Sequence, residues 1–125
     1  MQTKDQTYAA KIFTQVSAVS AVAEGDRKKY GAMAHKLPIL IRTAGLAQAL
    51  AYVEARSETP TKLLLDHLAE VVGAGSRQQL LVHSRTASLS EYMRLTRDAL
   101  AALLWYKRFA QSVLGVDASD EGGSI

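Results

Sequence analysis

Apolar residues recur along this chain at spacings of three and four positions, which is the period of an α-helix with one buried face. Near the N-terminus such a face would consist of Tyr8, Ile12, Val16, Val19 and Ala23. Polar residues lie between them, and no stretch shows the two-residue alternation that indicates a half-buried strand. The pattern therefore predicts an all-α fold.

Glycine and proline divide this pattern into segments. Glu24-Gly25 is expected to end the first helix, and Asp26 to cap a second helix that runs to Lys36. Proline lacks an amide hydrogen and disfavours helical geometry in the residue before it. Leu37-Pro38 therefore predicts a break or kink, with Pro38 in the first turn of a third helix.

The third helix is expected to continue to about Arg56 and to contain Gly45. A glycine inside a helix costs roughly 1 kcal/mol relative to alanine. Together with Ala49, one turn later, Gly45 would form a stripe of small residues where another helix can approach closely.

Capping signals predict the remaining helix starts. Thr59-Pro60 supplies a cap and a first-turn residue, and Gly73-Ala74-Gly75 stops the helix that follows. In a capping box a hydroxyl and a returning side chain bond the exposed amides of the first turn. Two such boxes are predicted, Ser76 with Gln79 and Ser88 with Glu91. The whole is a compact bundle of about five to six helices.

The composition indicates one ordinary domain. The chain has 125 residues, 48% of them hydrophobic, which is enough for a modest core. It contains no cysteine, which excludes a disulfide scaffold and thiolate chemistry and is typical of a reducing compartment. No stretch resembles a membrane span or a signal peptide. We therefore expect a cytoplasmic protein without membrane association.

The charge is distributed unevenly. The net charge is +3, but Asp117, Asp120 and Glu121 lie in a C-terminal stretch without a cation, so the remaining 15 cations face 9 anions. Residues 1–115 are expected to form the helical domain, and residues 116–125 a disordered acidic tail. A basic body of net charge +6 favours a polyanionic partner without identifying one.

The last predicted helix has two unequal faces at about 100° per residue. Its broad apolar face is expected in the core and consists of Tyr92, Leu95, Ala99, Ala102, Leu103, Tyr106, Phe109, Ala110 and Val113. The opposite stripe holds Arg94, Arg97, Ala101, Trp105 and Arg108. Three guanidinium groups and an indole can bind phosphates and stack on a base. The alternative is a solvated face, in which Arg94 pairs with acids on its own helix.

Other cations have the same two interpretations. Lys36 and Arg42 lie on either side of the predicted proline break. The cluster Arg27-Lys28-Lys29 lies in the first turn of a helix, where the macrodipole disfavours cations, so either a partner or the acids Glu24 and Asp26 would compensate it.

Catalytic and metal-binding motifs are absent from the sequence. His35, His67 and His83 do not have the spacing of paired metal ligands on one helix. Asp66, His67 and Glu70 place two carboxylates beside an imidazole, but a capped, solvated helix face explains this arrangement more simply. No nucleophile elbow, phosphate-binding glycine loop or zinc-protease motif occurs. We therefore expect no enzyme activity, no cofactor and no small-molecule ligand.

Two stretches carry a family resemblance. They are YGAMAHKLPILIRTAGLAQALAYVEAR and EYMRLTRDALAALLWYKRFAQ. These stretches resemble the small-subunit family of the type III-B CRISPR effector, the Cmr module. The resemblance implies a non-catalytic helical protein, stacked in several copies beside the repeated backbone subunit and the duplex of guide and target RNA. The nuclease would be that backbone subunit.

The two stretches also contain the candidate nucleic-acid contacts. Contacts that follow an RNA backbone use lysine and arginine without reading bases. The candidates are Lys36 and Arg42 in the first stretch and Arg94, Arg97, Trp105, Lys107 and Arg108 in the second. Two alternatives remain: a protein-protein adaptor without nucleic-acid contact, and an enzyme built on Asp66, His67 and Glu70.

Overall fold

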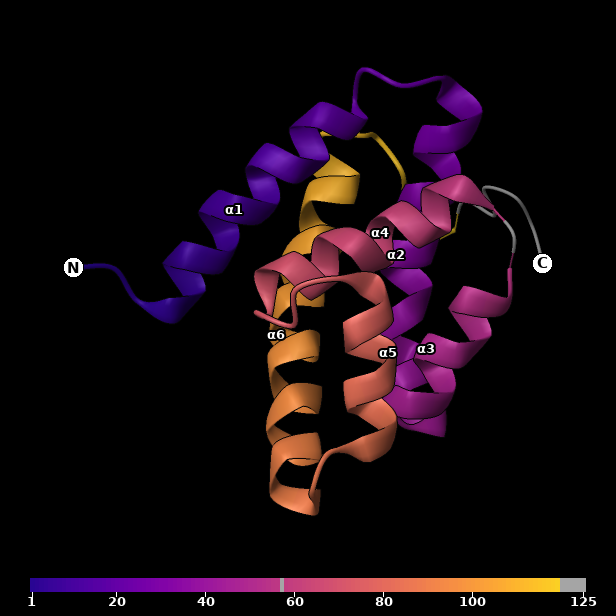
Figure 1. Ribbon diagram of the computed structural model, residues 1–125. Helices are drawn as coiled ribbons and strands as arrows, with labels where there is room; N and C mark the ends of the chain where they lie inside the picture. The colour runs from indigo at the N-terminus through magenta and orange to yellow at the C-terminus, as the bar shows by residue number, and fades with distance from the viewer. Residues whose placement is uncertain (57, 120–125) are drawn as a thin grey trace.

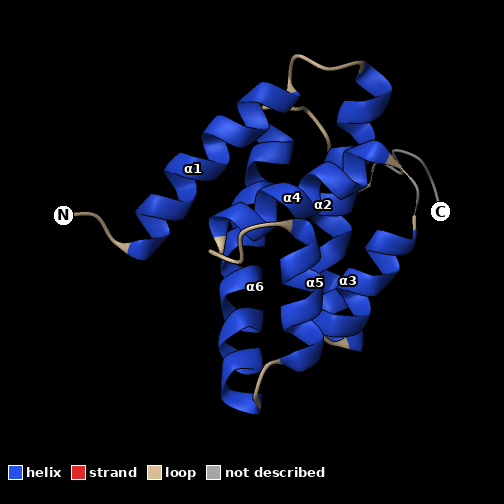
Figure 2. Ribbon diagram, in the orientation of Figure 1, coloured by secondary structure: helices blue, strands red, loops and turns tan. Residues whose placement is uncertain are grey.

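A computed structural model describes residues 1–56 and 58–119 of the protein. In this part of the chain six helices are present and strands are absent, as Figures 1 and 2 show. The helices are α1 (Lys4–Val19), α2 (Glu24–Ala44), α3 (Leu46–Ala55), α4 (Thr59–Val71), α5 (Arg77–Thr86) and α6 (Leu89–Ser112). The prediction of an all-α bundle is confirmed.

The two longest helices, α2 and α6, form the most extensive pairing in the bundle. The hydroxyl of Tyr92, near the start of α6, accepts from the Ala47 amide just beyond the end of α2, at 3.1 Å. At the other end Val116, beyond α6, packs on Gly31, near the start of α2. The two helices therefore run antiparallel, while α1 lies across α6 and α4, and α5 packs on α3 and α4 (Figure 1).

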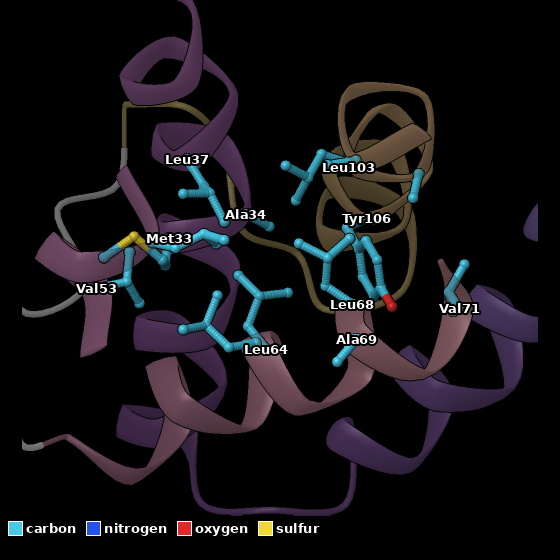
Figure 3. Close-up of a cluster of buried hydrophobic side chains, with 14 of the residues drawn as sticks. Met33, Ala34, Leu37, Val53, Leu64, Leu68, Ala69, Val71, Leu103 and Tyr106 are labelled. Atoms are coloured by element: carbon cyan, nitrogen blue, oxygen red, sulfur yellow. The ribbon is translucent and has the colours of Figure 1, made fainter. Parts of the chain in front are cut away.

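The core lies where α2, α4 and α6 meet, and Figure 3 shows their apolar side chains converging. Fully buried members from these helices include Leu37, Leu64, Leu68, Leu103 and Tyr106. The predicted inner face of α6 is confirmed at its central positions, and Tyr92, Phe109 and Val113 are partly buried at its margins. The buried apolar positions are Leu95, Ala99, Ala102, Leu103, Tyr106 and Ala110. The predicted face of α1 is also confirmed, except that Ala23 lies beyond the helix and is exposed. None of the helices in the described residues is both long and apolar enough to cross a bilayer.

The predicted break at Leu37-Pro38 is wrong. Helix α2 continues through Pro38 to Ala44, with Leu37 and Pro38 both buried. The proline forfeits one helical hydrogen bond, and burial of its ring and of Leu37 in the core offsets that cost. A local rule about proline was overridden by tertiary packing.

The break between helices occurs instead at Gly45, which was predicted to lie inside a helix. Its φ is 92°, which is in a region that residues other than glycine rarely adopt. Its amide donates to the Ile41 carbonyl at 2.9 Å, and its carbonyl accepts from the Ala49 amide at 3.0 Å. Gly45 thus ends α2 and begins α3 in a single residue.

Two predicted helix starts are displaced. Helix α1 ends at Val19, and α2 begins at Glu24, so Asp26 is inside α2 and does not cap it; the cap position is Ala23, without a side-chain bond. Similarly, Thr59 is the first residue of α4 rather than its cap. In both cases the chain enters the helix earlier than the capping residue indicated.

Hydroxyl caps were predicted more accurately. Ser76 and Gln79 form the expected capping box at the start of α5. Ser88 caps α6 by accepting from the Glu91 amide, but the Glu91 carboxylate bonds to Arg94 instead of returning to the cap. A further box, Thr3 with Gln6, begins α1 and was not predicted.

The segment after α6 is packed at its start. Val116 was predicted to open a disordered tail, yet it is buried, its amide donates to the Ala110 carbonyl at 2.8 Å, and its carbonyl lies 2.9 Å from Nε2 of the buried His35. The packed domain therefore extends at least to Val116. Residues 117–119 of the predicted tail are exposed, and residues 120–125 lie outside the described residues.

Candidate nucleic-acid interface

The outer side of α6 carries two unneutralised guanidinium groups. Arg97 and Arg108 are exposed, and neither forms an ion pair or hydrogen bond within residues 1–56 and 58–119. They project within about 20° of each other at 100° per residue. Arg108 is eleven positions after Arg97, so at a rise of 1.5 Å per residue the two stand about 16 Å apart along the helix axis. Such a pair can contact phosphates of one backbone.

Arg94 does not belong to this unneutralised set. Its guanidinium bonds Asp98 Oδ2 at 3.2 Å and Glu91 Oε2 at 3.4 Å, both on its own helix. The hydrogen bond to Glu91 raises the pKa of Arg94 above its usual value. The stripe therefore has two available guanidinium groups and not three, and the self-pairing alternative holds for Arg94.

Asp98 explains why Arg94 is held in place. This carboxylate is largely buried and also accepts from Lys4 Nζ at 2.6 Å, so it joins the start of α1 to the middle of α6. That hydrogen bond raises the pKa of Lys4. Lys4 and Asp98 are 94 positions apart, and nothing in the sequence indicated their contact.

Trp105 is half-buried and is not the open stacking plane that was predicted. Its Nε1 donates to Asp5 Oδ1 at 2.8 Å, and its ring packs on Phe109 with centroids 5.6 Å apart. Phe109 in turn meets Phe13 of α1 edge to face at 5.4 Å. Trp105 therefore fixes α1 against α6, and its indole N–H is already bonded within the protein.

The remaining predicted contacts do not form one surface with Arg97 and Arg108. Lys107 and Arg42 are exposed, and neither has a partner among the residues described. Lys107 projects about 100° away from Arg108 around α6. Lys36 is on α2, where its Nζ lies 3.4 Å from the hydroxyl of Tyr52 on α3. The candidates therefore divide between α6 and the α2–α3 side.

The basic cluster at the start of α2 is compensated within the protein. Lys28 pairs with Glu24 at 3.7 Å, and Lys29 pairs with Glu58 at 3.2 Å. Arg27 donates to backbone carbonyls of the preceding turn. Glu24 was predicted as a partner, but Glu58 replaces Asp26 in that role.

Asp66, His67 and Glu70 each bond a different residue and do not bond one another. His67 Nδ1 lies 2.7 Å from the Tyr30 hydroxyl, and burial lowers the pKa of His67. Glu70 accepts from Gln15 at 2.9 Å, and Asp66 from Arg77 at 3.4 Å. Within the described residues no group of three potential ligands could hold a metal ion.

Comparison with known proteins identifies the family of this helical bundle. A family model described as CRISPR-associated protein (Cas_Cmr5) matches residues 4–113. The chain belongs to the Cmr5 family. A relative named CRISPR system Cmr subunit Cmr5, from Thermus thermophilus, is 45% identical over 114 residues, which are 91% of this chain and 98% of the relative.

The fold agrees with that membership. A crystal structure of a CRISPR-associated Cmr5 family protein, also from Thermus thermophilus, matches with a TM-score of 0.85 at 42% identity, over 90% of this chain and 98% of that one. The resemblance to the Cmr small-subunit family is thereby confirmed. The Cmr5 match includes every predicted contact from Lys36 to Arg108 and excludes the acidic tail.

Proposed function

We propose that this protein is a non-catalytic small subunit of a type III-B CRISPR effector, the RNA-guided Cmr complex, and acts in antiviral defence. Copies of it stack along the repeated backbone subunit, which cuts the target RNA. Its basic side chains help to hold the duplex of guide and target RNA. Membership of the Cmr5 family supports the assembly, and the name of the Thermus thermophilus relative, a Cmr subunit, supports the partners.

The observation that supports RNA contact is that the guanidinium groups of Arg97 and Arg108 are exposed and have no carboxylate partner among the described residues. On the same helix Asp98 neutralises Arg94, and it also pairs with Lys4 of α1. Arg97 and Arg108 are exposed on one side of α6 without such a partner among the described residues. Backbone phosphates would supply the missing negative charge without reading sequence.

Charge reversal tests this contact. In the assembled complex, Arg97→Glu with Arg108→Glu should weaken target-RNA retention, because two phosphate contacts become repulsive. The slope of log affinity against log salt should become shallower by about 0.7–0.9 per lost contact. Retention is measured by filter binding over a salt series, and circular dichroism checks that the subunit keeps its helices.

A matched control uses the same change of charge elsewhere. Lys11→Glu with Arg85→Glu also reverses two exposed cations, on α1 and α5, and neither of them has a partner among the described residues. This control should change retention much less than the α6 pair. Equal RNA retention and equal salt slopes for the wild-type and the α6 variant would contradict the proposed contact.

A second candidate, a protein-protein adaptor, is favoured by exposed apolar side chains on the same helix. Leu89, Met93 and Leu104 are 74%, 52% and 47% exposed on the outer side of α6. Exposed apolar groups of this kind suit a protein neighbour better than a phosphate backbone. If the adaptor is correct, the charge-reversed pair should lower the number of subunit copies in the purified complex, and RNA bound per remaining copy should stay constant.

A further inference from the structure

A second basic cluster lies where α2 and α3 are side by side, and it is centred on a tyrosine. The Tyr52 hydroxyl oxygen accepts from Lys36 Nζ at 3.4 Å and from Arg56 Nη1 at 3.2 Å. Both cations also lie over the ring, at 5.5 Å and 5.8 Å from its centroid. Two cations therefore converge on one neutral, exposed oxygen.

Negative charge is scarce in this cluster. Glu58 is its one carboxylate within the described residues, and it is shared, bonding Arg56 at 3.3 Å and Lys29 at 3.2 Å. Lys36 has no carboxylate partner in the same part of the chain. Three cations around one anion leave an excess of positive charge, concentrated on the side of Lys36.

The excess of positive charge also affects the pKa of Tyr52. The hydrogen bond from Lys36, followed by the charges of Lys36 and Arg56, lowers the pKa of this phenol from its ordinary value. Elsewhere in the fold burial raises the pKa of Tyr8, Tyr30 and Tyr106. The surroundings of the Tyr52 oxygen thus favour negative charge.

We propose that Lys36, Tyr52 and Arg56 form a binding site for a single phosphate group. One phosphate oxygen would lie between the ammonium and the guanidinium. The Tyr52 hydroxyl, which now accepts from both cations, would donate its proton to another oxygen. Arginine and lysine together with a hydroxyl donor are a common phosphate-binding set.

The phosphate group has two possible sources, a nucleic-acid backbone and a free phosphate ion. The assignment to RNA rests on the proposed function, because it gives the subunit a second backbone contact, on helices other than α6. The site itself does not depend on Arg97 or Arg108, and it is tested on the isolated chain.

The test follows the side chains of the site by NMR in the isolated full-length protein. Titration with inorganic phosphate and, separately, with a short oligouridylate should shift the Tyr52 ring and Arg56 Nε resonances. Tyr52→Phe keeps the net charge and removes one donor, so oligouridylate affinity should fall about three- to tenfold. Lys36→Gln should lower the affinity further and reduce the salt slope by about 0.7.

Arg85→Gln is the matched control, since Arg85 is an exposed cation on α5 without a partner among the residues described. It should leave the shifts at Tyr52 unchanged. Shifts with phosphate and not with oligouridylate would support the phosphate site and overturn its assignment to RNA. Wild-type affinity in both Tyr52→Phe and Lys36→Gln would overturn the site itself, whatever the α6 variants do in the complex.

Discussion

Replacing Tyr106 with alanine is expected to lower the free energy of unfolding by about 3–5 kcal/mol, the cost of removing a large buried aromatic side chain. Tyr106 is fully buried on α6, and its ring lies beside Leu68 of α4 in the core (Figure 3). Its hydroxyl donates to Gln15 Oε1 on α1. Gln15 in turn donates to Glu70 Oε1 on α4 at 2.9 Å. One side chain therefore fills the core and connects three helices.

The matched variant Tyr106→Phe separates these two contributions. It keeps the ring and removes the hydroxyl bond to Gln15, so its expected cost is about 0.5–1.5 kcal/mol. Both variants are measured by urea unfolding monitored by helical circular dichroism. Burial raises the pKa of Tyr106, so the phenol remains a donor across the accessible pH range. A loss below about 1 kcal/mol for Tyr106→Ala would mean that the ring is not in the core.

Gly31→Ala is expected to destabilise the protein by about 1–3 kcal/mol, as overpacking does. A Cβ at this position would lie 2.7 Å from Val116 Cβ and 2.9 Å from both of its methyl groups. Alanine is otherwise favoured over glycine inside a helix by about 1 kcal/mol, so the steric conflict must reverse the sign. The chain after α6 would then leave its place on α2, and the Val116 amide should lose protection from hydrogen exchange.

A control and a double variant identify the cause of this effect. Gly25 is also in α2, and a Cβ there meets nothing within 4 Å, so Gly25→Ala should leave stability unchanged or raise it by up to about 1 kcal/mol. Gly31→Ala combined with Val116→Gly keeps the added Cβ and removes the Val116 side chain against which it would clash. Its loss should be smaller than the sum of the single losses. Additive losses would show that Val116 does not rest on Gly31.

The parts of the fold that were predictable depend on regular periodicity. The inner face of α6 was correct because Leu95, Ala99, Ala102, Leu103 and Tyr106 repeat at the helical period. Helix boundaries were less predictable, because they depend on competition between local preference and packing. Pro38 remains inside α2 because its surroundings bury it.

In the candidate site, too, periodicity predicted some features, and others depended on contacts between distant parts of the chain. That Arg97 and Arg108 lie outside the core followed from their positions on the helix. The state of Trp105 did not, because its partner Asp5 is 100 positions away in the sequence. Tyr52 and Arg56 escaped notice since one aromatic residue and one arginine, four positions apart, form no distinctive pattern until Lys36 is brought beside them by the α2–α3 packing.

The two basic surfaces proposed as RNA contacts lie on different parts of one domain. Arg97 and Arg108 lie on the outer side of α6, and Lys36 and Tyr52 lie where α2 and α3 meet. The antiparallel pairing of α2 with α6 fixes the two surfaces relative to each other, because the core between them is rigid and closely packed. Variants in one surface should therefore leave the other folded and available.

The most direct measurement is photocrosslinking of target RNA, carrying 4-thiouridine along the guide-paired region, to the assembled complex, followed by mass spectrometry of the subunit. The proposed function predicts adducts on α6 between Arg97 and Arg108, and their loss in the charge-reversed pair. Efficient crosslinks to the other subunits, with none on α6, would contradict it.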